Sequence, residues 1–262
     1  MDLGLKDKIA LVAGASKGLG LAVAEALGME GAKVAICSRN KDNLEKARRG
    51  LEDLGIEVFS IQADVSVPEQ AQTFVTDSAK HFGGADILIN NAGGPPAMLF
   101  EETDKDIWEQ GFRLNLLSTI IMTRTVIPYM KEKMWGRIVN MTSIAVKQPI
   151  DGLIISNTVR SGVIGLAKTL SRELASYNIT VNNVCPGYFL TSRVSGLATK
   201  IAEKTGGDPS DVIKTWEKDI PLARMGEPKE LGALVCFLCS SSAAYITGTS
   251  IQIDGGLYRG LL

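Results

Sequence analysis

The stretch Ile9-Ala-Leu-Val-Ala-Gly14-Ala-Ser-Lys-Gly18-Leu-Gly20 joins a short apolar run to a helical pattern through three glycines. Gly14 permits a tight turn, Gly18 lets the backbone approach a phosphate, and Gly20 lets the helix pack closely on the strand. The N-terminus of the following helix then presents free N–H groups and the positive end of its dipole to an anion. This stretch therefore predicts a βαβ unit that binds the phosphates of a dinucleotide.

The same alternation of strand and helix patterns continues along the chain. Short β-branched runs are separated by longer amphipathic segments, and no repeat or linker divides them. We expect one α/β domain over residues 1–262, a Rossmann fold with a doubly wound parallel sheet of seven strands and helices on both faces. The expected strands are Ile9–Ala13, Lys33–Ser38, Glu57–Gln62, Ile87–Asn90, Arg137–Thr142, Thr180–Cys185 and Ser250–Ile253. The expected helices are Leu19–Met29, Leu44–Leu54, Glu69–Phe82, Asp104–Lys133, Thr158–Tyr177 and Lys229–Leu238.

Composition excludes several classes of function. The 262 residues carry a net charge of -1, which argues against nucleic acid and membrane surfaces as partners. The N-terminal residues lack the apolar core of a signal peptide, so we expect a cytoplasmic protein. Cys236 and Cys239 lie three residues apart in an apolar helical stretch, where small core residues are expected, and His81 is the only histidine. We expect no metal site.

The end of the second expected strand, Ser38-Arg39-Asn40, bears on the choice of nucleotide. A site for NAD(H) would place a carboxylate there to accept a hydrogen bond from the ribose 2′-hydroxyl. Arg39 instead offers a planar fork suited to a 2′-phosphate, and Lys17 adds a second cation nearby. The pattern favours NADP(H) over NAD(H), with two ordinary solvated charges as the alternative.

Residues 191–222, between the last two expected strands, interrupt the alternation. They are polar and contain glycine, with short helices expected at Ala198–Lys204 and Ser210–Lys218. An insertion at the carboxyl edge of a parallel sheet is placed to act as a substrate lid, or is a surface excursion without function. Its cations alternate with acidic residues, which favours a solvated mixed face over an anion site. These cations are Arg193, Lys200, Lys204 and Lys214.

Further segments follow the expected strands in order. They are Ala63-Asp-Val65, Asn90-Asn-Ala-Gly93, Asn140-Met-Thr-Ser143, Pro186-Gly-Tyr-Phe-Leu-Thr191, Tyr245-Ile-Thr-Gly248 and Asp254-Gly-Gly256. With the glycine loop, they resemble the short-chain dehydrogenase/reductase family over essentially the whole chain, and look most like its 3-oxoacyl-(acyl carrier protein) reductase branch. The resemblance implies an NADP-dependent oxidoreductase that transfers hydride between nicotinamide and a carbonyl or alcohol group of a small molecule. It also implies a homotetramer.

The resemblance assigns roles to residues by position. Asn115 is expected to anchor a water in a proton relay, and Ser143 to hydrogen-bond the substrate carbonyl. The structural alternatives are that Asn115 caps a helix irregularity and that Ser143 simply ends a strand. The implied catalytic residues are Ser143, Asn115, Ser156, Arg160 and Tyr188. The implied cofactor-binding residues are Gly14, Ser16, Lys17, Gly18, Leu19, Gly20, Ser38, Arg39, Asn40, Asp64, Val65, Asn91, Ala92, Gly93, Arg160, Pro186, Gly187, Phe189 and Thr191.

The chain departs from the family at the catalytic motif. The family has Tyr-x-x-x-Lys where this chain has Ser156-Asn-Thr-Val-Arg160. One helical turn separates the two positions, so both side chains are expected in the same cleft. A serine hydroxyl is a far weaker acid than a phenol. Arg160 is able to hydrogen-bond a ribose diol, but it does not shuttle protons.

Three functions remain open from the sequence. The first keeps hydride transfer with another proton donor, for which Tyr188, Lys147 and Asp151 are candidates. The second is a non-redox protein that binds NADP(H) as a sensor or as a partner subunit. The third is a dehydratase-like or isomerase-like enzyme that uses the same pocket. The apolar residues just before Ser156 indicate either an uncharged substrate moiety or a part of the core.

Overall fold

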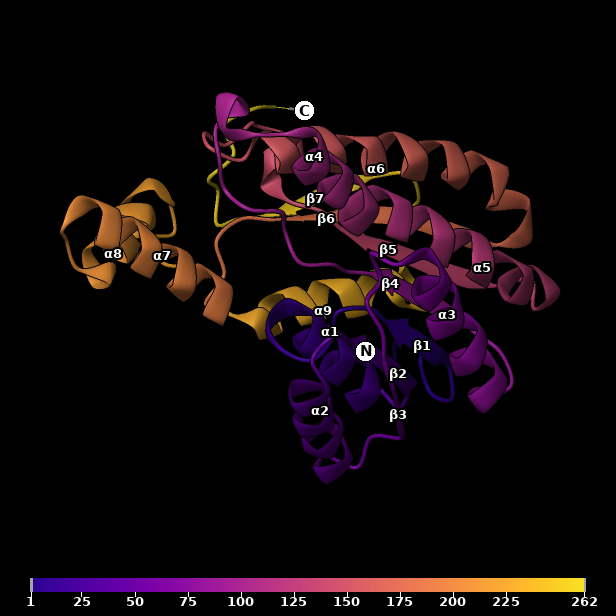
Figure 1. Cartoon of the computed structure of the whole chain (residues 1–262). Coiled ribbons are helices and arrows are strands. Elements are labelled where there is room, and N and C mark those ends of the chain that lie inside the picture. The colour runs from indigo at the N-terminus through magenta and orange to yellow at the C-terminus, as the bar shows by residue number, and fades with distance from the viewer. Residues whose placement is uncertain (1, 262) are drawn as a thin grey trace.

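The computed structural model describes residues 2–261, apart from the side chains of Lys200 and Lys204, so the expectation for those two lid cations lies outside the described residues. Seven strands form one sheet in the order β3-β2-β1-β4-β5-β6-β7 (Figure 1). All neighbouring strands run parallel, which confirms the predicted α/β sheet. The strands are β1 (Ile9–Val12), β2 (Lys33–Ser38), β3 (Val58–Gln62), β4 (Ile87–Asn90), β5 (Gly136–Met141), β6 (Ile179–Pro186) and β7 (Ser250–Ile253).

Helices cover both faces of this sheet (Figure 1). Helices α1, α2 and α9 bury one apolar core against it, and α3, α5 and α6 bury a second core on the other face. Strands β4 and β5 are buried at every position because both of their faces are covered. The helices are α1 (Gly18–Met29), α2 (Lys41–Asp53), α3 (Pro68–Phe82), α4 (Lys105–Phe112), α5 (Ser118–Glu132), α6 (Ile154–Glu173), α7 (Ser192–Thr205), α8 (Pro209–Asp219) and α9 (Pro228–Cys239).

The strand order reverses between β1 and β4. From β1 the chain moves outward through β2 and β3, and then returns to β4 on the other side of β1. The helices that follow β1 and β4 cover opposite faces of the sheet, so a crevice is expected at the carboxyl ends of these strands. The segments that follow β5 and β6 reach the same edge of the sheet, because all the strands are parallel. This edge is where the predicted site residues gather.

Several helices begin earlier than the sequence predicts, and the differences are largest for α6 and α7. Helix α6 begins at Ile154 rather than Thr158, and α7 begins at Ser192 rather than Ala198. The side chain of Thr191 caps α7 by accepting a hydrogen bond from a backbone N–H of the first turn at 3.4 Å. Helix α6 starts inside an apolar run without a side-chain cap, so packing rather than a local signal sets its first residue.

Residues 191–222, the predicted lid segment, form α7 and α8, which pack on each other and project from the body of the protein (Figure 1). Asp208 caps α8 by accepting a hydrogen bond from the N–H of Ser210 at 2.7 Å. Between residues 2 and 261, the structure contains no helix that is long and apolar enough to span a bilayer.

Candidate functional site

The glycine loop between β1 and α1 forms the floor of the crevice. Gly14 and Gly18 have φ angles of +59° and +60°, a region in which a side chain is strained. A Cβ at Gly20 would lie 2.5 Å from the carbonyl oxygen of Gly14, so this position admits only glycine. Asn91, just after β4, donates from Nδ2 to the carbonyls of Ala13 and Gly14, both at 3.1 Å. These contacts hold the loop in the shape that the sequence predicted.

The N-terminus of α1 is open toward the crevice. Lys17 is the N-cap residue, and its side chain makes no capping hydrogen bond. The first N–H groups of the helix are therefore available to an anion. Across the crevice, a Cβ at Gly18 would lie 3.6 Å from the Cγ2 atom of Thr191. The glycine loop and the start of the lid thus face each other, and this cradle fits the pyrophosphate of a dinucleotide.

The ends of β2 and β3 form the nucleotide end of the crevice. The hydroxyls of Ser16 and Ser38 share a hydrogen bond of 2.8 Å. Arg39 is exposed, and its Nη1 lies 3.8 Å from Oδ2 of Asp64. Asp64 follows β3 whereas Arg39 follows β2, so this proximity was not predicted from the sequence. Asn40 caps α2 by accepting a hydrogen bond from a backbone N–H of the first turn.

Ser156 and Arg160 are both buried and lie one turn apart on α6, as predicted, at 7% and 8% exposure. Nη1 of Arg160 donates to the carbonyl oxygens of Met141 and Thr142 at 2.9 and 3.1 Å. Its Nη2 donates to two carbonyls of the loop after β4 at 3.5 and 3.4 Å. Burial and, to a smaller extent, the charge of Arg193 lower the pKa of Arg160 to about 10, so it remains a cation at neutral pH. The guanidinium therefore ties the end of β5 to the loop after β4.

The two serines of the predicted site differ in their hydrogen bonding. Oγ of Ser143 accepts a hydrogen bond from the N–H of Ala145 at 3.2 Å and begins the 3₁₀ turn Ile144–Val146. Because Ser143 acts there as an acceptor, its own hydroxyl proton remains available to a ligand. The hydroxyl of Ser156 makes no hydrogen bond to any residue in the described range 2–261.

Asn115 lies in the π-helical turn Arg113–Leu117, which divides the single helix expected over Asp104–Lys133 into α4 and α5. Its Nδ2 donates to the carbonyl of Gly93 at 2.9 Å. Its Oδ1 is buried and finds no hydrogen-bond partner among the described residues. Turns of this kind frequently occur at functional sites, and a buried acceptor of this kind suits an ordered water. The geometry fits the water anchor that the resemblance implies.

The three candidate proton donors lie in different environments. The ring of Tyr188, just after β6, stacks on Trp216 of α8 with the ring centroids 5.2 Å apart. Burial, together with a neighbouring carboxylate, raises the pKa of Tyr188, so its phenol is protonated at neutral pH. Nζ of Lys147 lies 5.7 Å from the centroid of the Tyr258 ring, and Asp151 is exposed on a turn. The contact between Tyr188 and Trp216 joins two elements, so the sequence contained no signal for it.

The remaining predicted cofactor-binding residues lie in different surroundings. Gly187 follows β6, and a Cβ there would lie 2.8 Å from the Cβ of Asp254, so the chain passes closely at this point. Phe189 is 3% exposed, packs against Gly226 and joins the core that α1 and α9 share. Its side chain is therefore part of the core rather than of the crevice wall. Val65 is likewise buried, in the core on the opposite face.

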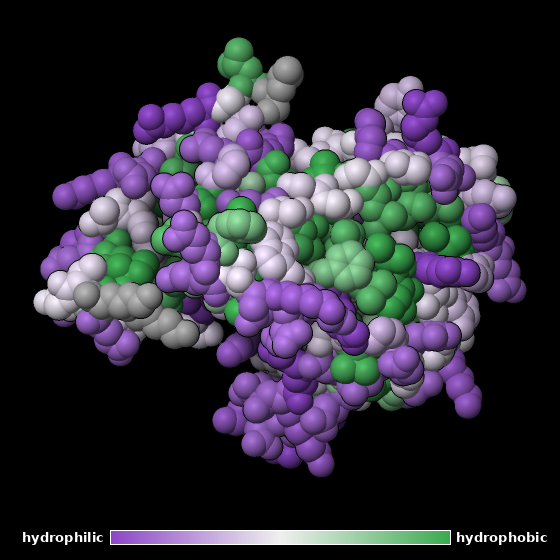
Figure 2. Space-filling model, turned by 45° about the horizontal axis from the view of Figure 1, so that its top comes forward, coloured by the Kyte–Doolittle hydropathy of each residue, from purple (hydrophilic) through white to green (hydrophobic). Residues whose placement is uncertain are grey.

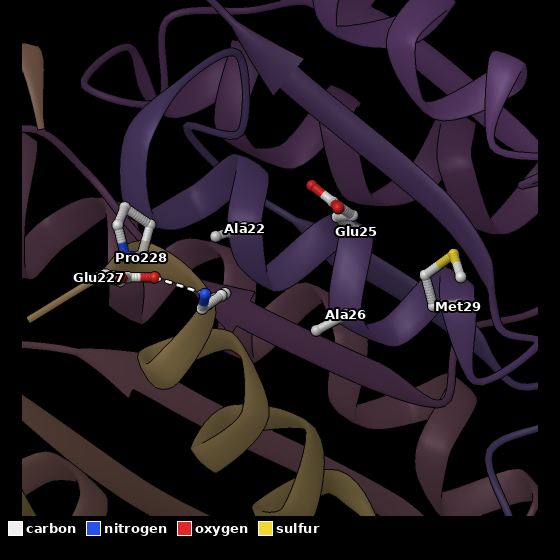
Figure 3. Close-up of a pocket in the computed structure, with 7 residues that line it drawn as sticks. Ala22, Glu25, Ala26, Met29, Glu227 and Pro228 are labelled. Atoms are coloured by element: carbon white, nitrogen blue, oxygen red, sulfur yellow. Dashed lines mark ion pairs between the residues drawn. The ribbon is translucent and has the colours of Figure 1, made fainter.

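A hollow of about 390 Å³ lies elsewhere, between α1 and α9 (Figure 3). Its walls come from two helices on one face of the sheet, and Lys229 pairs with Glu227 at its rim at 2.6 Å. None of the predicted site residues contributes to it. The residues that line it are Ala22, Glu25, Ala26, Met29, Glu227, Pro228 and Lys229. Over the described residues, no cluster of side chains suited to a metal ion is found.

Comparisons with known proteins agree with this geometry. A family profile described as Enoyl-(Acyl carrier protein) reductase matches residues 14–258. The chain is 35% identical to Nodulation protein G of Azospirillum brasilense over 256 residues, which cover 97% of this chain and 99% of that protein. It is 32% identical to the 3-oxoacyl-(acyl-carrier-protein) reductase FabG of Aquifex aeolicus (strain VF5) over 262 residues, which cover 98% and 100%.

A solved structure shows the same fold. L-sorbose reductase from Gluconobacter frateurii, complexed with NADPH and L-sorbose, matches with a TM-score of 0.95 at 33% identity over 100% of both chains. The family profile and the identities together show that the chain belongs to the short-chain dehydrogenase/reductase family.

Proposed function

We propose that this protein is an NADP(H)-dependent oxidoreductase that transfers hydride between nicotinamide and a carbonyl or alcohol group of a small molecule. The observation that carries the proposal is the cradle at the start of α1, where the glycine loop and the uncapped helix N-terminus face Thr191. The L-sorbose reductase structure, which holds NADPH and a sugar, supports it. Hydride transfer is the cofactor's chemistry, and the chain supplies binding, orientation and a proton.

Arg39 and Lys17 are the residues that favour a 2′-phosphate in this proposal. Arg39 is exposed and lies 3.8 Å from Asp64, a separation at which an exposed ion pair contributes little to stability. Its guanidinium is therefore free to turn toward a phosphate, and in doing so it offsets the repulsion between that phosphate and Asp64.

Four residues are assigned to the substrate end of the crevice. Ser143 would donate its hydroxyl proton to the carbonyl oxygen, and Asn115 would hold a water through its unpaired Oδ1. Arg160 acts as a positioning residue, because its four hydrogen bonds hold the loop after β4 against the end of β5. Tyr188 is the first candidate for the proton, since its phenol remains protonated at neutral pH. Residues 191–222 would close over this end as a lid.

A screen for NADPH consumption over small ketones, aldehydes and 3-oxoacyl thioesters tests this function. We expect turnover with at least one class, slower consumption of NADH, and a loss of roughly 10²-fold or more in Ser143→Ala, the usual scale for removing a catalytic hydrogen bond. Binding of NADPH to each protein, measured by fluorescence, separates lost chemistry from lost cofactor. Tight binding of NADPH without turnover of any substrate would reject the redox function.

That last outcome would favour a second function, a non-redox protein that binds NADP(H) as a sensor or partner subunit. Two observations support it. The hydroxyl of Ser156 has no hydrogen-bond partner in the described part of the chain, and the guanidinium of Arg160 donates to backbone carbonyls. Neither residue therefore reproduces the Tyr and Lys pair that the family motif places at these positions.

We also propose that the protein is a homotetramer in the cytoplasm. Figure 2 shows apolar atoms gathered over the region of α4, α5 and α6. Phe112 is 43% exposed, and Ile120, Ile164 and Leu166 are partly exposed. A Cβ at Gly165 of α6 would meet nothing within 4 Å, so a neighbouring helix can approach closely. A face of this kind suits a two-fold related copy. A monomer in light scattering at micromolar concentration would refute the assembly, and cell fractionation tests the location.

A further inference from the structure

Arg193, the second residue of α7, reaches back from the lid to the body of the protein. Its guanidinium lies against Gly94, where an added Cβ would be 2.6 Å from Cζ. The preceding residue, Gly93, accepts hydrogen bonds through its carbonyl from Asn115 and from Arg160. The guanidinium of Arg193 is therefore placed beside the loop that forms one wall of the crevice, and only a glycine at position 94 leaves it room.

Among residues 2–261, the charge of Arg193 has no counter-ion. Elsewhere on the surface Arg48, Arg113 and Arg224 each pair with a carboxylate. Arg193 has neither a carboxylate nor a hydrogen-bond acceptor as a partner among residues 2–261. The positive charge of Arg193 lowers the pKa of Arg160, so two like charges lie close to each other. Burial lowers the pKa of both groups, although Arg193, unlike Arg160, keeps an exposed side chain.

The two cations differ in what they offer to a ligand. Both terminal nitrogens of Arg160 already donate to backbone carbonyls, whereas the donors of Arg193 are unused within the described residues. A guanidinium presents parallel N–H groups that match the two oxygens of a carboxylate or a phosphate. An oxyanion bound at Arg193 would also relieve the repulsion between the two arginines. Arg193 is exposed, as a cation of the solvated mixed face expected from the sequence would be, but its guanidinium also lies against Gly94.

We propose that Arg193 is an anion-binding residue that holds an oxyanion of the ligand against the Gly93–Gly94 loop. The oxyanion is either a carboxylate of the substrate, a source that rests on the function proposed above, or a phosphate of the dinucleotide. In the first case the substrate is an oxo acid or hydroxy acid rather than a neutral ketone. In the second case Arg193 joins the lid to the cofactor, beside the Thr191 cap that faces Gly18.

The test compares wild type with Arg193→Met, which keeps length and removes charge. Lys214→Met, a change of an exposed cation on α8, is the matched control. Three probes are titrated by calorimetry. They are NADPH; 2′,5′-ADP, which carries the 2′-phosphate and the adenosine-side 5′-phosphate but lacks the nicotinamide-side phosphate; and malonate, added with and without excess NADP⁺. Unchanged binding of 2′,5′-ADP shows that the variant is folded. Gly94→Ala, which excludes the guanidinium from its position, should act in the same direction as Arg193→Met.

We expect Arg193→Met to weaken one probe by roughly 10- to 100-fold, the usual range for a lost charge-assisted hydrogen-bond pair. Weaker binding of malonate with unchanged binding of NADPH assigns the site to a substrate carboxylate. Weaker binding of NADPH with unchanged binding of 2′,5′-ADP assigns the site to a cofactor phosphate. If both NADPH and malonate bind as they do to wild type, or if Lys214→Met has the same effect, the proposal is overturned. A wild type that binds malonate but not NADPH would reject the proposed function while leaving the anion site intact.

Discussion

Replacing Ser156 by tyrosine together with Arg160 by lysine tests whether the crevice is still built for carbonyl reduction. The two positions lie one turn apart on α6 and are both buried. A phenol at position 156 would reach toward the carbonyl that Ser143 is proposed to hold, and a lysine at position 160 would lower its pKa. We expect NADPH-dependent ketone reduction to rise by roughly 10²–10⁴-fold, the range of general acid catalysis.

The hydrogen bonds of Arg160 set the cost of this change in stability. Two are short, at 2.9 and 3.1 Å, and two are long, at 3.5 and 3.4 Å. A lysine has three donors and no planar fork, so at least one carbonyl loses its partner, at a cost of about 1–3 kcal/mol. A phenol inserted at the buried Ser156 adds about 1–3 kcal/mol of overpacking. For a chain of this size the sum corresponds to a decrease in Tm of roughly 5–20 °C.

The assay follows NADPH absorbance over a panel of ketones and aldehydes, with NADPH binding and circular dichroism measured for each variant. Ser156→Tyr alone retains the Arg160 hydrogen bonds and serves as the better folded comparison. It should gain less activity, because an arginine does not pass protons to the Asn115 water. Arg160→Lys alone should lose stability and gain nothing. A folded double variant that binds NADPH but reduces nothing would show that the crevice is not shaped for carbonyl reduction.

Three further changes test other parts of the structure. Arg39→Asp places a second carboxylate beside Asp64, so the preference for NADPH over NADH should fall at least about tenfold in fluorescence titrations. An unchanged ratio of the two affinities would remove the role assigned to Arg39. Tyr188→Phe keeps the stack on Trp216 but removes the hydroxyl, and native turnover should fall by roughly 10²-fold without a change in Tm. Unchanged turnover in this variant would assign Tyr188 to packing. Because the pKa of Tyr188 is raised above its ordinary value of 10, wild-type turnover should be lost only as pH rises above 10. Asn140→Leu breaks a buried chain of amide hydrogen bonds, 2.8 and 2.9 Å long, from β4 to β6. It should cost roughly 2–4 kcal/mol in chemical denaturation, and a loss below about 1 kcal/mol would contradict this.

The fold and the phosphate loop could be predicted because their signals are local. Runs such as Lys33–Ser38 and Ile87–Asn90 are apolar except at their ends, as is typical of strands covered on both faces. The structure has these two strands at the predicted bounds. The glycines of the loop are required by backbone geometry that neighbouring residues set, and the structure shows positive φ angles at Gly14 and Gly18. The first residue of α6 was missed, because it is set by tertiary packing.

The sequence alone determined the α/β architecture and the glycine loop, and its family resemblance predicts that Ser156 and Arg160 stand at the positions of the catalytic motif. Only the tertiary structure decided what these side chains meet. Arg160 donates to four carbonyls, at the end of β5 and on the loop after β4, and the guanidinium of Arg193 lies against Gly94. Such contacts join residues that are far apart in the chain, and their partners are backbone atoms that every residue carries. Composition and spacing therefore do not predict these contacts, which form only when folding brings the strands and the lid together.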